Sequence, residues 1–258
     1  MRATLAQLAP QVRDVSANLS RVKTVLDSSK DTDLVLFPEL FLSGYELGDA
    51  QAVCIDLDGP EVGVLREAAR DNDTAIVVGA AERVTNGVAN SALCISRWGE
   101  LAGVYRKTHL FGAEAGSYVP GDELVTVELD GRILGLMICF DVEFPEVART
   151  LALRGADVLV TISANPEAFR RDHEVFVPAR ALENGVPHLY VNRVGRQEDI
   201  SFGGTSMAID PEGTVLSVTG PEDEEMLDAT ISDAGRRDER TRYLDLLRPS
   251  LYDRLETP

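Results

Sequence analysis

Apolar residues recur along the chain with two different spacings, and together they predict an alternation of strands and helices. Short runs that are almost wholly apolar, Leu34–Phe37 and Val158–Ile162, predict buried strands. Apolar residues at every third or fourth position predict helices over Val15–Leu26 and Glu61–Arg70. This order of elements is typical of an α/β protein.

Hairpin signals complete the pattern. The predicted strands Val88–Ser96 and Leu101–Arg106 are joined by four turn residues, and Leu124–Leu129 and Arg132–Phe140 are joined over Asp130-Gly131, which suits a type I′ turn. Further strands are predicted at 2–8, 75–78, 187–192, 205–209, from 214 and at 227–231, and further helices at 145–155, 172–184 and 242–247. The pattern predicts a mixed sheet, or two sheets covered by helices.

Length and charge limit the classes of function. The 258 residues contain no stretch rich in Pro, Gly and Ser, so we expect a single domain over 1–258. With 25 Lys and Arg against 43 Asp and Glu, the net charge is −18. A chain this acidic repels phosphates and anionic lipids, so we expect neither nucleic acid nor a membrane as a partner.

Cysteine usage and the N-terminus predict a cytoplasmic protein. Three cysteines, an odd number, argue against a disulfide framework and for a reducing compartment. The first ten residues, MRATLAQLAP, lack the apolar core of a secretion signal. No uninterrupted apolar run approaches the ~20 residues that a membrane helix needs.

Three chemically active residues stand where predicted strands end. Glu39 follows the strand Leu34–Phe37, Lys107 follows the strand Leu101–Arg106, and Cys139 closes an apolar run that begins at Ile133. Taken alone, each has an ordinary interpretation, as a loop carboxylate, a solvated lysine and a small core side chain. If the three strands are neighbours, however, the side chains converge at one rim, where α/β enzymes place reactive groups.

Three separated motifs resemble the signature blocks of the nitrilase superfamily of carbon–nitrogen hydrolases. They are PEL at Pro38–Leu40, YRKTHLF at Tyr105–Phe111 and ICFDVEFPE at Ile138–Glu146, and weaker similarity extends over nearly the whole chain. The resemblance implies a four-layer α-β-β-α sandwich. It also implies protomers that pair through their helical faces into homodimers or larger homo-oligomers, and we expect the charged tail, about 232–258, to take part in those contacts.

The resemblance also implies catalytic roles for Glu39, Lys107 and Cys139, with Glu114 as a further glutamate. Cys139 would attack as a thiolate, which the charge of Lys107 favours, and Glu39 would act as the base. The ammonium of Lys107 and the backbone N–H of Phe140 would stabilise the oxyanion. Glu114 would orient Lys107 or the substrate nitrogen.

Several residues near these motifs are weighed as pocket residues. Tyr45 and Asn165 would flank the cysteine if the strand order is as inferred. Asp141, Glu143 and Glu146 are interpreted first as cap or ion-pair residues of the helix that follows, with the alternative that Glu143 faces the pocket and prefers a substrate amine. Arg170 and Arg171 are interpreted as solvated, with a substrate carboxylate as the alternative.

We assign no catalytic or metal-binding role to the remaining cysteines and histidines. Cys54 and Cys94 are expected to pack as small apolar side chains, and His109 to support the lysine block through hydrogen bonds. The histidines lack any spacing typical of a metal site, so we expect no metal and no cofactor.

The predicted reaction is thiol-dependent hydrolysis of a small-molecule amide to a carboxylic acid and ammonia, as in the aliphatic and ω-amino-acid amidases of the superfamily. The alternatives are an N-carbamoyl amine or amino acid hydrolase, and a nitrilase. A binding protein that kept the fold and lost activity is disfavoured because all three signature residues are present. A subunit that feeds ammonia to a separate synthetase is a further alternative. The acyl group, stereochemical preference and oligomer size stay open.

Overall fold

The computed structural model describes residues 1–29, 31–231 and 243–251, which form two six-stranded sheets packed face to face. The strand order of the first sheet is β14-β1-β2-β3-β4-β5, and β1, β2 and β3 run parallel. Its strands are β1 (Arg2–Gln7), β2 (Leu34–Leu36), β3 (Ala75–Val84), β4 (Gly87–Ile95), β5 (Leu101–Arg106) and β14 (Glu225–Thr230).

The second sheet has the order β13-β12-β9-β8-β7-β6, with β7, β8 and β9 parallel. Its strands are β6 (Thr126–Leu129), β7 (Arg132–Ile138), β8 (Val158–Ser163), β9 (His188–Asn192), β12 (Met207–Ile209) and β13 (Val215–Val218). A separate short hairpin pairs β10 (Arg196–Gln197) with β11 (Ile200–Ser201). Parallel strands in each sheet place their carboxyl ends at one edge, which is where the reactive residues lie.

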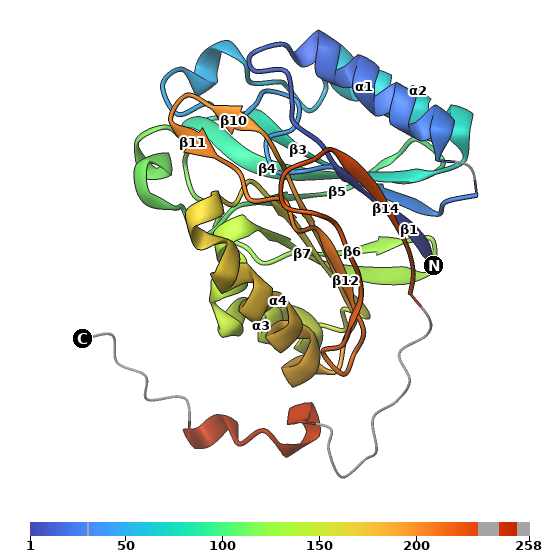
Figure 1. The fold of residues 1–258 in the computed structure, drawn as a ribbon, viewed down its shortest axis with the longest axis vertical. Helices are drawn as coiled ribbons and strands as arrows, with labels where there is room; N and C mark the ends of the chain where they lie inside the picture. The colour runs from blue at the N-terminus through green and yellow to red at the C-terminus, as the bar shows by residue number, and fades with distance from the viewer. Residues whose placement is uncertain (30, 232–242, 252–258) are drawn as a thin grey trace.

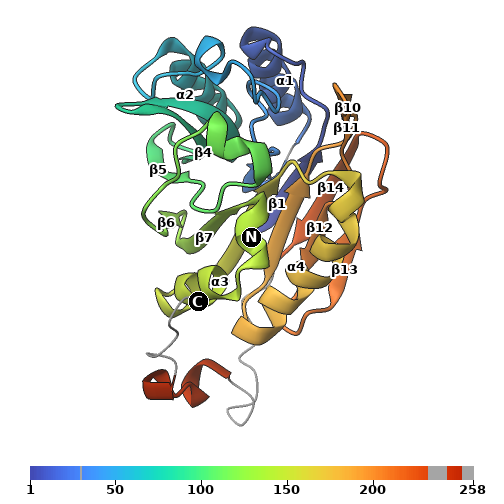
Figure 2. The same ribbon diagram turned by 90° about the vertical axis from the view of Figure 1, so that its left-hand side faces the viewer.

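Four helices cover the outer faces of the two sheets. As Figures 1 and 2 show, α1 (Val15–Ser28) and α2 (Pro60–Asn72) lie over the first sheet, and α3 (Pro145–Leu153) and α4 (Arg170–Asn184) lie over the second. Buried side chains such as Leu36 and Ile138 fill the space between the sheets. The predicted α-β-β-α sandwich is therefore confirmed.

Local signals in the sequence account for many element ends. Pro60 and Pro145 occupy the first turn of their helices, where a backbone N–H would have no acceptor within the helix, so its absence removes no hydrogen bond. Gly185 ends α4 with a left-handed φ of 65°. Asp130 and Gly131 both have positive φ, 51° and 79°, as the predicted type I′ turn between β6 and β7 requires.

Apart from small shifts at the ends of other elements, the structure differs from the prediction as follows. β3 continues to Val84, six residues beyond the predicted end, because it pairs with β4 along that whole length. β7 ends at Ile138, two residues before the predicted end. The hairpin of β10 and β11 was not predicted. The helix predicted over 242–247 is a 3-10 helix at Tyr243–Leu246, and residue 242 lies outside the described residues.

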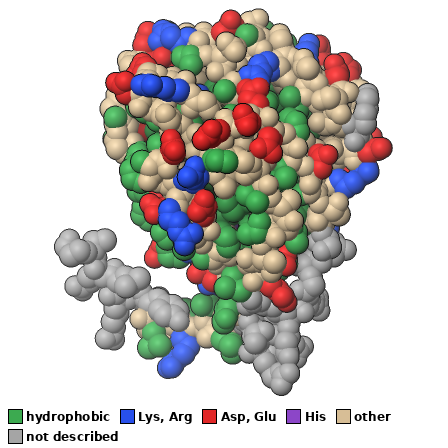
Figure 3. Space-filling model, viewed as in Figure 1, with side chains coloured by type: hydrophobic (Ala, Val, Ile, Leu, Met, Phe, Trp, Pro, Cys, Tyr) green, Lys and Arg blue, Asp and Glu red, His purple; other side chains and the backbone are tan. Residues whose placement is uncertain are grey.

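On the face drawn in Figure 3, acidic side chains are spread among basic and hydrophobic ones. None of the helices within residues 1–29, 31–231 and 243–251 is both long and apolar enough to cross a membrane. Most of the predicted contact tail, 232–242 and 252–258, lies outside the described residues.

Candidate active site

The three predicted catalytic residues meet because the two sheets pack face to face. Glu39 follows β2 and Lys107 follows β5, and both belong to the first sheet, whereas Cys139 follows β7 in the second. β3 and β4 separate β2 from β5, so the three strands are not neighbours, which was the condition considered from the sequence for their convergence. Lys107 Nζ nevertheless donates a hydrogen bond of 2.7 Å to Glu39 Oε1.

The Glu39 carboxylate is fully buried and held by three donors. Oε1 accepts hydrogen bonds from Lys107 Nζ at 2.7 Å and from Asn90 Nδ2 at 2.6 Å, and Oε2 accepts one from the backbone N–H of Ala164 at 2.7 Å. Burial raises the pKa of Glu39 and Lys107 lowers it by less, so the net pKa lies above the usual value. A buried carboxyl whose pKa is raised has the basicity that a general base needs.

Gly79 of β3 holds the turn that presents Glu39, a role that the sequence analysis missed. Its N–H donates to the Pro38 carbonyl at 3.2 Å, and its carbonyl accepts from Leu42 N at 3.1 Å. A Cβ at Gly79 would lie 2.3 Å from Leu40 N and 2.4 Å from the Pro38 oxygen. A glycine inside a strand is a signal of such close backbone approach.

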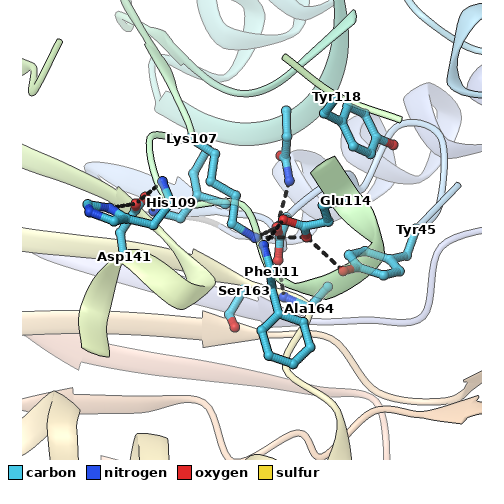
Figure 4. Close-up of polar contacts among 12 residues, drawn as sticks. Tyr45, Lys107, His109, Phe111, Glu114, Tyr118, Asp141, Ser163 and Ala164 are labelled. Atoms are coloured by element: carbon cyan, nitrogen blue, oxygen red, sulfur yellow. Dashed lines mark hydrogen bonds and ion pairs between the residues drawn. The ribbon is translucent and has the colours of Figure 1, made fainter. Parts of the chain in front are cut away.

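Lys107 lies between two carboxylates. In addition to its bond to Glu39, its Nζ donates to Glu114 Oε1 at 2.8 Å, and all three side chains are fully buried (Figure 4). Burial lowers the pKa of Lys107, but the two carboxylates and Cys139 raise it by more, so the net pKa lies well above its usual value. The side chain is therefore an ammonium at neutral pH.

Glu114 joins Lys107 to the predicted pocket residue Tyr45. The Tyr45 hydroxyl donates to Glu114 Oε1 at 2.7 Å, and the backbone N–H of Phe111 donates to Oε2 at 2.8 Å. Figure 4 shows these side chains pointing toward one another from separate segments. Every oxygen of this buried carboxylate thus has a donor, which fixes the orientation of the ammonium that it binds.

Cys139 occupies a sharp turn directly after β7. Its φ is 46°, in the left-handed region that side chains rarely adopt, and it opens the 3-10 helix η3 (Cys139–Glu143). Strained backbone of this kind is concentrated at functional sites. The predicted oxyanion donor Phe140 follows in the first turn of η3, where backbone N–H groups have no acceptor within the helix.

The Cys139 thiol is protonated in the resting site. Burial raises its pKa, the Glu39 carboxylate raises it further, and Lys107 and a hydrogen bond with Ser163 lower it by less. The net pKa lies well above the usual value. Burial and Glu39 therefore outweigh the attraction of Lys107, and this is consistent with the expectation that a base, Glu39, takes the thiol proton.

Asp141 connects the cysteine turn to the lysine segment. It is buried in η3, where Oδ2 accepts hydrogen bonds from Ile138 N at 2.9 Å and the Tyr105 hydroxyl at 2.8 Å, and Oδ1 accepts from His109 N at 3.0 Å. The His109 ring stacks on Phe144 with centroids 3.9 Å apart. Asp141 is thus no cap of the following helix, contrary to the prediction, and His109 has the predicted supporting position.

A small pocket opens at Cys139. Its lining contains the predicted residues Tyr45, Phe140, Glu143 and Asn165, together with Phe111, Ala164, Pro166, Phe169 and His173. Glu146, by contrast, is exposed in the first turn of α3, as predicted.

Arg170 and Arg171 do not line this pocket. Their side chains lie 3.8 and 3.5 Å from the Glu174 carboxylate on the same helix. This arrangement agrees with the interpretation that both arginines are solvated, and it gives no support to a role in binding a substrate carboxylate.

A line of polar side chains extends behind Cys139, and the sequence analysis did not assign Tyr190 and His173 to it. Ser163 forms a hydrogen bond with the thiol, and the Tyr190 hydroxyl lies 3.2 Å from Ser163 Oγ and 2.8 Å from His173 Nδ1. His173 Nε2 lies 3.6 Å from Glu143 Oε1. These residues come from β8, β9, α4 and η3, and no local motif in the sequence links them.

Comparison with known proteins identifies the family. The model of the family described as carbon-nitrogen hydrolase matches residues 2–239. The chain belongs to the carbon–nitrogen hydrolase family. A probable nitrilase of Schizosaccharomyces pombe is 37% identical over 272 residues, covering all of both chains. An (R)-stereoselective amidase of Pseudomonas sp is 40% identical over 224 residues, which cover 85% of this chain and 81% of the amidase.

A solved structure of similar fold supports the same assignment. An amidase of Nesterenkonia sp. AN1 superposes with a TM-score of 0.86 at 30% identity, covering 98% of this carbon–nitrogen hydrolase and 95% of the amidase. That structure, of a variant, has the acetamide moiety of fluoroacetamide added covalently to its active-site cysteine. The predictions of family, fold and enzyme class are confirmed.

Proposed function

We propose that this carbon–nitrogen hydrolase cleaves the amide bond of a small molecule to a carboxylic acid and ammonia, through a thioester on Cys139. The observation that carries the proposal is the buried ammonium of Lys107 between Glu39 and Glu114, beside a strained cysteine that lines a pocket. The amidases among its relatives, one with an adduct on its active-site cysteine, support the predicted thiol-dependent amide hydrolysis.

Acylation begins with transfer of the thiol proton from Cys139 to Glu39 as the sulfur attacks the amide carbon. The negative charge that develops on the carbonyl oxygen is stabilised by the Lys107 ammonium and the Phe140 N–H, each worth roughly 3 kcal/mol in the transition state. Glu39 then gives its proton to the amide nitrogen. The C–N bond breaks, ammonia leaves and the acyl group remains on sulfur.

Deacylation uses the same groups, with water as the nucleophile. Glu39, again a carboxylate, takes a proton from water as the water oxygen attacks the thioester carbon. The same two donors stabilise the second oxyanion. When the C–S bond breaks, the sulfur receives the proton from Glu39, so the carboxylic acid leaves and the resting thiol is restored. Glu114 and Tyr45 keep Lys107 in place throughout.

A screen of ammonia release tests the proposal, with amides, N-carbamoyl compounds and nitriles as substrates and Cys139→Ala as the blank. We expect ammonia from amides with the parent and none with the variant. Carbon dioxide released together with ammonia would indicate the carbamoyl hydrolase instead. A variant as active as the parent would overturn the role of Cys139. No ammonia and no covalent adduct on Cys139 across the panel would favour the non-enzyme alternative.

We propose further that the chain forms one domain and assembles into a cytoplasmic homodimer or larger homo-oligomer through α3, α4 and the tail. Large apolar side chains are exposed on these segments, namely Leu153, Val175 and Leu182 on the helices and Leu246 and Leu251 in the described part of the tail. The number of protomers in solution, from light scattering on the full chain and on a chain ending at residue 231, tests the assembly and the role of the tail. A monomeric full chain would contradict the assembly, and an unchanged number of protomers after truncation would contradict the role of the tail.

A further inference from the structure

The pocket at Cys139 combines aromatic walls with one carboxylate. The Phe111 ring makes edge contacts with Phe140 and with Phe169, each with centroids 5.3 Å apart, and all three rings line the pocket. Among the described residues that line it, Glu143 alone has a carboxylate, and there is no lysine or arginine. The pocket thus combines one carboxylate with several aromatic rings.

Within residues 1–29, 31–231 and 243–251, no charged Lys or Arg forms an ion pair with the Glu143 side chain. His173 Nε2 is 3.6 Å away, and burial lowers the pKa of His173 more than Glu143 raises it, so the imidazole is neutral at pH 7. Arg180 donates to the backbone carbonyls of Val142 and Glu143, and its side-chain ion pair is with Glu183 at 3.1 Å. The Glu143 side chain is 25% exposed and available to a ligand in the pocket.

Lys107, the cation of the catalytic centre, does not neutralise the charge of Glu143 either. Lys107 already lies between Glu39 and Glu114, so the centre itself has no excess positive charge to offer. A carboxylate in a confined, partly dry pocket attracts a cation more strongly than one in water. Aromatic rings around it favour ammonium groups in particular, since these interact with π faces.

We propose, on the basis of the proposed function, that the acyl part of the substrate carries an ammonium group that binds Glu143 among these rings. Cys139 and Glu143 are four residues apart in a 3-10 helix, which places their Cα atoms about 8 Å apart along its axis. This spacing suits an ammonium a few bonds from the scissile carbonyl. The substrate class is therefore amides of short amino acids.

Two amides of equal size test the inference. β-Alaninamide and butyramide have the same number of heavy atoms, and differ in a terminal ammonium in place of a methyl group. At pH 7, where a primary amine is protonated, we expect kcat/KM of the parent to be at least about tenfold higher for β-alaninamide, corresponding to about 1.4 kcal/mol. Glu143→Gln removes the charge and keeps the shape, so this ratio should fall by about tenfold.

The matched control is Glu146→Gln. Glu146 loses the same charge but is exposed on α3 and does not line the pocket, so activity and the ratio should both stay at the parental values. A parent without preference, or a ratio that Glu143→Gln leaves unchanged, overturns the inference while ammonia release from butyramide upholds the proposed function. Absence of ammonia from the whole amide panel overturns the proposed function instead.

A measurement on the parent alone keeps the inference testable if Glu143→Gln does not fold. A ligand that occupies the pocket should inhibit ammonia release from butyramide competitively. We expect propylammonium to inhibit at concentrations where 1-propanol, its neutral counterpart of equal size, has no effect. Equal inhibition by the two compounds, or inhibition by neither, contradicts an ammonium subsite at Glu143.

Discussion

The Glu39 carboxylate accepts a hydrogen bond of 2.7 Å from the backbone N–H of Ala164, a residue that directly follows β8 in the opposite sheet. The proposed base on the first sheet is therefore attached to the sheet that presents the proposed nucleophile, Cys139. Hydrogen bonds to a charged carboxylate are stronger than neutral ones, so this contact helps fix the distance between base and thiol. The geometry of the site depends on the packing of both sheets.

The raised pKa of Glu39 predicts the acid side of the pH profile. Only the carboxylate form can take the Cys139 proton, so kcat/KM should rise with pH as Glu39 loses its proton, with a midpoint above the ~4.3 of an ordinary glutamate. The measurement is kcat/KM for butyramide, whose own charge does not change with pH. Glu39→Gln should be about 10²- to 10⁴-fold slower and lack this transition. A midpoint at or below the ordinary value contradicts the assignment.

The sequence predicted the elements well because the information for them is local. Asp130-Gly131, Gly185 and the apolar run Leu34–Leu36 each specify their structure through their own side chains or lack of one. The residues Glu39, Lys107 and Cys139 could be found because each lies in a distinctive motif at a strand end. Their family resemblance, rather than periodicity, indicated that the three belong to one site.

The sequence could not predict how those residues meet. β3 and β4 lie between β2 and β5, so β2 and β5 are not neighbours. This strand order depends on pairing across the whole sheet. Asp141 was interpreted from the helix that follows it, but its hydrogen bonds are to Ile138 and to the segment after β5. Contacts between residues distant in sequence determine both outcomes.

Replacement of Lys107 by methionine is expected to reduce both stability and activity. It leaves Glu39 and Glu114 buried without their shared cation, and breaking a buried ion pair costs about 3 to 5 kcal/mol. Urea unfolding measures the loss of stability, and ammonia release measures the loss of activity. The double variant Lys107→Met with Glu114→Gln removes one of the two carboxylates, so it should regain part of the stability and none of the activity. Parental stability of Lys107→Met would contradict the ion pair.

Asp141→Asn should reduce kcat more than it changes KM. The carboxylate accepts hydrogen bonds from Tyr105, Ile138 and His109, and an amide nitrogen cannot accept any of those made to the replaced oxygen. Hydrogen bonds to charged groups contribute about 1.5 to 3 kcal/mol each, so unfolding should also become easier by roughly that amount. Glu146→Gln, with an exposed acid on the next helix, is the control. Equal kinetics for parent and Asp141→Asn would show that Asp141 does not position Cys139.

Gly79→Ala should impair catalysis through the turn that carries Glu39. The new methyl group would lie 2.3 Å from Leu40 N and 2.4 Å from the Pro38 oxygen, both backbone atoms, so the turn has to move. A misplacement of about 1 Å in a catalytic group can cost about 10²-fold in rate, and we expect a loss of kcat of that order. Gly63→Ala is the matched control, because Gly63 lies in α2 with nothing within 4 Å of an added Cβ. That change should stabilise the protein by roughly 0.5 to 1 kcal/mol with parental kcat. A Gly79→Ala variant that also keeps parental kcat would show that the close approach of β3 does not position Glu39.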